Sequence, residues 1–289
     1  MLDLSHIPNS QQDIKIFYAN GSAWQTWNKP RKCNYVYIMC IGGGGGGAGL
    51  SSGGFSNVFA GGASGAVSRA LYNIQQLPDR LYVQVGLGGV GGSPGIGGSN
   101  GTRSIVSMQP VSAAQNQVGI SGNVGALGGS GGGATYAGET ASTQATATFY
   151  TLSNFISTAG VTTPLYTNAT IDITPLTSQI TCPGAGAGTF TSPTTPAIIE
   201  ASSINATVYS PRIQGGTSYL TSTNGTNGGD GITCWKPFFS TGGAGGGGSF
   251  SGTGGNGGNG GIGSGGGAGG YGGGSGGKGG DGLVIIISF

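Results

Sequence analysis

The chain has 289 residues and a net charge of +2, and only 6% of its residues are charged. Glycine accounts for 68 residues, more than three times its average share of about 7%. The basic residues form no patch or stripe, which argues against nucleic-acid binding, and no apolar run reaches the roughly 20 residues of a membrane-spanning helix. Disorder of the whole chain is also disfavoured, because 36% of the residues are apolar and disordered chains combine few apolar residues with high charge.

The N-terminal segment, residues 1–20, has neither the basic region nor the apolar region of a secretory signal. We therefore expect synthesis in a cytoplasm, and we interpret the segment as an arm that could anchor the protein to a partner. Within it, Ile14–Ala19 alternates as a short strand does. Further along, Tyr35–Ile41 is rich in β-branched and aromatic residues, which is typical of a strand buried on both faces. This strand runs directly into six glycines, residues 42–47.

Two more strands, Ala66–Ile74 and Leu81–Val85, are predicted on either side of a turn that contains Pro78 and Asp79. A second glycine-rich block, residues 86–101, follows them. From 102 to 240 glycine becomes rarer, and short alternating runs are separated by proline, glycine and asparagine. That spacing predicts a Ser/Thr-rich β insertion, in which Ser112–Gly119 is a weak helix candidate.

The tail, residues 242–282, contains 27 glycines among 41 residues and repeats every three residues. From Ala244 to Tyr271 one residue in three carries most of the side chains, and after residues 272–274 this pattern shifts by one position. A flexible linker has no reason to keep a period, whereas an extended polyproline-II-type helix has three residues per turn and no internal hydrogen bonds. We therefore expect an ordered polyglycine-II-type rod whose backbone bonds to neighbouring glycine strands; the alternative is a disordered low-complexity spacer.

In such a rod, two glycine faces would pack against neighbours and the third face would carry side chains. This model predicts a surface on which four residues are candidates for binding: Phe250, Asn256, Asn259 and Tyr271.

The chain ends in an apolar run, Leu283–Phe289, which needs a partner strand. Its composition matches Tyr35–Ile41, so we expect these two strands to pair. The predicted organisation is a glycine-rich β domain formed by residues 21–101 and 241–289, with residues 102–240 inserted into it. The fold class we expect is all-β, with a β-sandwich or jelly-roll-like base, ordered polyglycine-II-type segments and a β-rich insertion.

The sequence offers little catalytic chemistry. His6 is the single histidine and the eight acidic residues are widely spaced, so neither a catalytic triad nor a histidine-rich metal site is predicted. The segment Gly86–Gly91 matches the dinucleotide-binding pattern GxGxxG, but no helix follows to bind a pyrophosphate. We expect no enzyme activity, no cofactor and no metal. The four cysteines do not form a disulfide scaffold.

Four stretches in order carry a family resemblance: WQTWNKPRKCNYVYIMCIGGGGGGAG, GGASGAVSRALYNI, LYVQVGLGGVGG and GGAGGYGGGSGGKGGDGLVIIISF. Together they resemble a glycine-rich domain of bacteriophage tail-fibre and other virion proteins, over residues 22–101 and 241–289. The resemblance implies a β-rich, non-enzymatic surface domain, and related phage adhesins pack polyglycine-II helices with receptor-contacting loops at the tip. The long segment 102–240 departs from that pattern, so no binding residues are transferred to it.

These observations lead to a virion structural protein on the particle surface: a tail fibre or tail tip, a head fibre or a capsid decoration. Its expected partners are other capsid or tail proteins, a host receptor or glycan, and copies of itself, for example in a trimer that covers open sheet edges. The alternatives are an extracellular glycine-rich structural or ice-binding protein, and a hydrolase located in residues 102–240.

Overall fold

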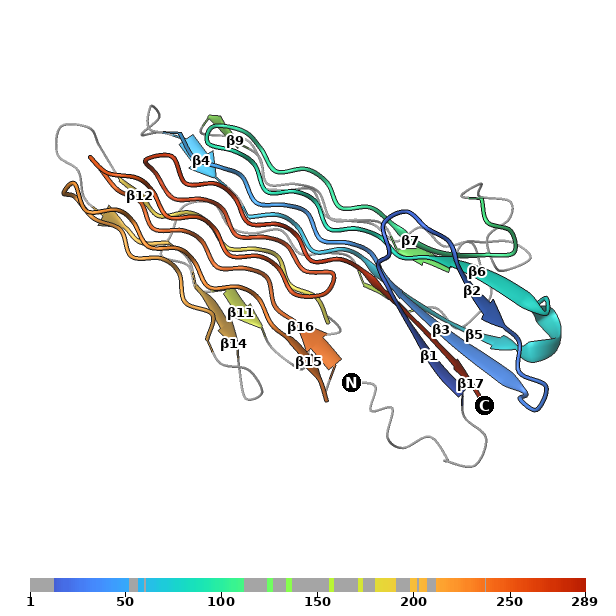
Figure 1. The fold of residues 1–289 in the computed structure, drawn as a ribbon. Coiled ribbons are helices and arrows are strands. Elements are labelled where there is room, and N and C mark those ends of the chain that lie inside the picture. The colour runs from blue at the N-terminus through green and yellow to red at the C-terminus, as the bar shows by residue number, and fades with distance from the viewer. Residues whose placement is uncertain are drawn as a thin grey trace.

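The computed structural model describes residues 13–51, 57–59, 61–111, 124–126, 134–136, 156–158, 171–173, 180–190, 198–201, 203–206, 212–236 and 238–289. The predicted all-β class is confirmed, because the described elements are strands apart from a single-turn 3₁₀ helix at Ile74–Gln76. The longer strands, among them β3, β5 and β17, gather at one end of an elongated molecule, and glycine-rich segments run side by side from them toward the other end (Figure 1).

The first sheet has the strand order β1-β17-β3-β5-β10 and is antiparallel throughout. Its strands are β1 (Asp13–Tyr18), β17 (Leu283–Ser288), β3 (Tyr35–Ile41), β5 (Val67–Asn73) and β10 (Ile156–Thr158). The predicted pairing of the C-terminal run with the strand before the first glycine block is confirmed, with Leu283 opposite Ile41 and Ser288 opposite Val36. This pairing brings the glycine blocks after Ile41 and before Leu283 together.

The second sheet has the order β2-β6-β7-β8 and is also antiparallel. Its strands are β2 (Gln25–Asn28), β6 (Arg80–Gln84), β7 (Ser104–Ser107) and β8 (Val124–Ala126). One core joins the two sheets, because Trp27 and Leu81 of this sheet cluster with Ile38 and Ile286 of the first. The turn between the predicted strands Ala66–Ile74 and Leu81–Val85 therefore leads the chain from one sheet to the other, and the two strands do not form a hairpin.

Strand β17, which lies between β1 and β3, is buried on both faces, as its uniform apolar sequence predicts. Val284 and Ile286 face the core that the two sheets share. Leu283, Ile285 and Ile287 belong to a second cluster on the opposite face of the sheet.

Four smaller sheets complete the strand inventory of the described residues: β4 (Asn57–Phe59) with β9 (Ala134–Tyr136), β11 (Ile171–Ile173) with β14 (Ile204–Ala206), β12 (Thr189–Phe190) with β13 (Ile198–Ile199), and β15 (Thr233–Trp235) with β16 (Phe238–Ser240). Only the β11–β14 pair is parallel. Short strands are therefore present within the predicted β insertion, at Ile171–Ile173, Ile198–Ile199 and Ile204–Ala206, while the candidate helix at 112–119 lies outside the described residues.

The glycine-rich segments form a lattice in which each extended segment, here called a rod, bonds to its neighbours through the backbone. Rod 263–271 shows the pattern most completely. Three consecutive N–H groups donate to three different rods: Gly267 to Gly258 O at 2.8 Å, Ala268 to Ala185 O at 2.9 Å, and Gly269 to Ala48 O at 2.8 Å. Three consecutive carbonyl groups accept from three further rods: Gly266 from Gly62, Ala268 from Gly246, and Gly267 from Gly277, each at 2.8 Å.

Six hydrogen-bonded neighbours around one rod define a hexagonal packing of helices with three residues per turn. The predicted polyglycine-II-type order is thus present, and its physical reason is that successive residues in such a helix point in three directions. Bonding in all three directions satisfies backbone groups that the helix itself leaves unpaired.

The tail was expected to form a single rod, and this expectation is wrong because the tail folds back on itself. It makes four passes, 241–250, 253–262, 263–271 and 274–282, which hydrogen-bond to one another. The last reversal is at Gly272 and Gly273, whose φ angles of 100° and 101° are in the region that favours glycine. The shift of the three-residue pattern at residues 272–274 therefore marks a turn between two rods.

The predicted organisation also differs from the observed one. Residues 13–18, assigned from sequence to an N-terminal arm, form β1 at the edge of the first sheet, and residues 1–12 lie outside the described residues. Rods 181–188, 213–219 and 224–233 fall within the predicted insertion, yet they bond to the tail, for example through Gly231 N to Asn259 O at 2.7 Å. The boundaries at 102 and 240 therefore do not separate two structural units among the described residues.

Candidate functional site

The candidate site is the outer surface of the lattice, where a rod has neighbours in only some of its three bonding directions. N–H groups that point toward this surface have no further rod to donate to. Polar side chains on adjacent rods accept these bonds instead, much as an N-cap side chain accepts the N–H groups at a helix start. We call the surface formed by rods 224–233, 253–262 and 275–281 the polar face.

A first ladder of side chains joins rods 224–233 and 253–262, with a constant offset of 29 residues. Side-chain oxygens on every third residue accept from every third N–H group: Asn224 from Thr253 at 2.9 Å, Asn227 from Asn256 at 2.8 Å, Asp230 from Asn259 at 2.7 Å, and Thr233 from Ile262 at 3.0 Å.

A second ladder continues across the polar face with an offset of 19 residues. Asn256 Oδ1 accepts from Ser275 N at 3.0 Å, and Asn259 Oδ1 accepts from Lys278 N at 2.9 Å. At its far side, Asp281 Oδ1 accepts from Gly88 N at 2.8 Å. The non-glycine residues at every third position of these rods thus complete the hydrogen bonding of the outermost backbone.

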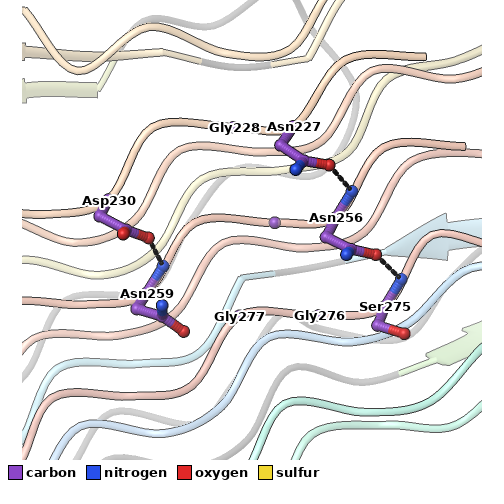
Figure 2. A pocket seen from close by; sticks show the side chains of 9 residues that line it. Asn227, Gly228, Asp230, Asn256, Asn259, Ser275, Gly276 and Gly277 are labelled. Carbon is purple, nitrogen blue, oxygen red and sulfur yellow. Dashed lines mark hydrogen bonds between the residues drawn. The ribbon is translucent and has the colours of Figure 1, made fainter.

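A shallow groove of about 370 Å³ lies on the polar face between the two ladders. Figure 2 shows it with Asn227 and Asp230 on one rod, Asn256 and Asn259 on the next, and Ser275 on the third. The remaining lining residues are glycines, at positions 228, 257, 276 and 277. Their lack of side chains leaves the groove floor at the level of the backbone.

The charges on the polar face are few and partly paired. Lys278 Nζ donates to Asp281 Oδ1 at 2.9 Å, and this ion pair is partly exposed. Asp230 is exposed and uses one carboxylate oxygen to accept from Asn259 N. The groove therefore presents amide, hydroxyl and carboxylate groups, with no unpaired cation among the residues that line it.

Two of the four candidate binding residues lie in this groove and two do not. Asn256 and Asn259 are exposed and line it. Tyr271 is only 3% exposed and Phe250 is partly buried beside it, both in a cluster with Leu50. The expectation that Tyr271 belongs to a surface is therefore wrong, because its rod lies inside the lattice, where Tyr271 N donates to Gly188 O at 3.0 Å.

Asn227 and Asp230, which form the other wall of the groove, were not among the binding residues predicted from the sequence. A signal was present: polar residues recur at every third position from Asn224 to Thr233, outside the segment where the three-residue period was counted.

The described part of the chain contains no cluster of three or more histidine, cysteine or acidic residues that could hold a metal ion. Within the same residues no helix is long and apolar enough to cross a membrane. His6 lies outside the described ranges.

Comparison with known proteins identifies the family of the chain. A family model described as a glycine-rich domain matches residues 19–288. A search of curated proteins finds no match. The matched region includes the second sheet, the first sheet apart from β1, and the whole described lattice, so the chain belongs to this glycine-rich domain family.

Proposed function

We propose that this protein is a non-enzymatic structural component of a bacteriophage particle, displayed on the particle surface as a tail fibre or tail tip, a head fibre or a capsid decoration. Its role there is host attachment or stabilisation of the particle. The observation that carries the proposal is rod 263–271 with its six hydrogen-bonded neighbours. A lattice held by backbone bonds in three directions is suited to a rigid support that presents a surface.

Two features agree with display on a particle. The polar face has its outward N–H groups already bonded by side chains, so it can remain in water without attracting further strands. The resemblance of four stretches of the chain to virion proteins gives the proposal its biological setting. Partners in this setting are other capsid or tail proteins, further copies of the chain, and a host receptor or glycan.

Mass spectrometry of purified particles tests the proposal. Particles are banded by density from lysates of the producing cells and digested with trypsin, and peptides 70–80 and 81–103, which end at Arg80 and Arg103, are quantified. The proposal predicts enrichment of both peptides with the particle band at a fixed ratio to the major capsid protein. Absence of the peptides from banded particles would refute it, and immunogold labelling of intact particles then separates a capsid location from a tail location.

A second candidate is an extracellular glycine-rich structural or ice-binding protein, and the regular spacing of side chains on the polar face favours it. Side chains on one rod recur every three residues, which corresponds to about 9 Å along a polyproline-II-type helix. Inhibition of ice recrystallisation by the purified chain would support this candidate, and normal recrystallisation would remove its ice-binding form.

A further inference from the structure

The groove on the polar face contains hydrogen-bonding groups whose orientation is already fixed. Asn227, Asn256 and Asn259 each accept a backbone bond through Oδ1, which assigns the other end of each amide as the NH₂ group. These three NH₂ groups have no partner among the described residues and remain as donors. Asp230 likewise uses Oδ1 and keeps Oδ2 as an acceptor.

The backbone of the groove is not available for strand addition. An extended peptide binds a sheet edge through a row of unpaired N–H and C=O groups. Here the outward N–H groups of Asn256, Asn259, Ser275 and Lys278 are each bonded to a side chain. The ligand class that fits is therefore one that bonds to side chains and needs no backbone ladder.

The charges exclude an anionic ligand. Asp230 contributes a carboxylate to the groove wall, which no lysine or arginine lines, and Lys278, on the rod that carries Ser275, is paired with Asp281 at 2.9 Å. An anionic polymer would meet the Asp230 charge without a compensating cation.

We propose that this groove binds a short neutral oligosaccharide. Sugar hydroxyl groups both donate and accept, so they can accept from the NH₂ groups of Asn227, Asn256 and Asn259 and donate to Asp230 Oδ2. The glycine floor lets a sugar ring lie against the backbone, and the volume of about 370 Å³ lies within the range of roughly 300–1,000 Å³ for small-ligand sites. Because the amides are held by the lattice before binding, little side-chain entropy is lost.

This inference deepens the proposed function and rests on it only for the location of the polar face at a particle surface. It is tested on the isolated full chain, whereas the proposed function is tested on purified particles, so the two can fail separately.

The experiment measures binding of neutral trisaccharides (maltotriose, cellotriose, mannotriose and triacetylchitotriose) by saturation-transfer NMR and titration, with a sulfated heparin oligosaccharide as the anionic comparison. The test variant is Asn256→Asp, which keeps the oxygen that accepts from Ser275 N, removes the NH₂ donor and adds one negative charge. Asn224→Asp is the matched control, because Asn224 accepts from Thr253 N in the same way but does not line the groove. Both variants add the same charge.

We expect at least one neutral trisaccharide to bind, the heparin oligosaccharide not to bind, and Asn256→Asp to weaken binding about tenfold, as for loss of one well-placed hydrogen bond. Asn224→Asp should bind as the unmodified chain does. Absence of binding across the neutral panel would overturn the proposal, as would equal losses in the two variants or preferential binding of the sulfated oligosaccharide.

Discussion

The N–H group of Asn256 donates to Oδ1 of Asn227, 29 residues earlier in the chain, over 2.8 Å. The side chain of Asn256 then accepts from Ser275 N on the following rod. One asparagine therefore connects three rods, through its backbone on one side and its side chain on the other (Figure 2). The same residues both finish the lattice and line the groove, so structural and binding roles must be separated by the choice of substitution.

Replacing Asn256 by alanine should destabilise the fold by about 1 kcal/mol, because Ser275 N would lose its acceptor, as in removal of a helix N-cap. Asn256→Asp should leave stability nearly unchanged, since it retains the accepting oxygen. Urea unfolding followed by the fluorescence of the buried Trp27 measures both. Equal destabilisation by the two variants would contradict the assigned capping role.

Replacing Gly267 by alanine should cost about 3 kcal/mol or prevent folding, because the new Cβ would overlap the carbonyl group of Ala244 on an adjacent rod. The control is Gly229→Ala, whose Cβ would first meet a movable side-chain atom, Ile213 Cγ2, at 3.1 Å. The thermal midpoint of each variant gives the comparison. A Gly267→Ala protein that melted like the control would show that the rods can separate without loss of stability.

Truncating Ile286 to alanine should destabilise the protein by about 2–5 kcal/mol, because this side chain is fully buried between the two sheets. The neighbouring edge strand β1 supplies the control Ile16→Ala, since Ile16 is 41% exposed. We expect its effect to stay below about 1 kcal/mol. Chemical unfolding of both variants decides whether the β17 core is as important as its burial indicates.

Stability should decrease as the pH rises from 9 to 12, because burial raises the pKa of two thiols. The pKa of Cys182 is raised from 9.0 to about 12, and burial also raises that of Cys40. Such a thiol ionises in the unfolded chain but stays neutral in the folded one. Its contribution to the free energy of unfolding is fully present below pH 9, and it is lost as the pH rises toward the pKa of the folded state. Between the pKa values of the unfolded and folded states, each such thiol lowers the free energy of unfolding by about 1.4 kcal/mol per pH unit.

Cys182→Ala removes one of these thiols, so its unfolding free energy should fall less steeply with pH by about that slope. Urea midpoints at pH 8, 9, 10 and 11 give the two slopes. Parallel curves for the variant and the unmodified chain would show that Cys182 is not protected from ionisation in the fold.

The sequence predicted the parts of this fold that depend on local pattern. Tyr35–Ile41 and Leu283–Phe289 were identifiable as partners because only strands buried on both faces are so uniformly apolar. The three-residue period likewise predicted rods, because no flexible segment would keep it.

The path of the tail through the lattice could not be predicted from local sequence pattern. Glycine is common both within rods and at turns, so the reversal at Gly272 and Gly273 has no distinct composition. Which side chains face water depends on the position of each pass in the lattice, a long-range property. Asn256 lies on an outer pass and Tyr271 on an inner one, although both occupy the same class of the repeat.

Rod 263–271 is surrounded by segments that begin as early as residue 42, and five of its six hydrogen-bonded neighbours precede it in the chain. The earlier rods therefore have no centre to assemble around while the chain is being made. Contacts between such distant segments also slow folding. The lattice around this rod can consequently form only once residues 263–271 have been synthesised, and a chain truncated after Ile262 should leave the earlier glycine blocks unassembled.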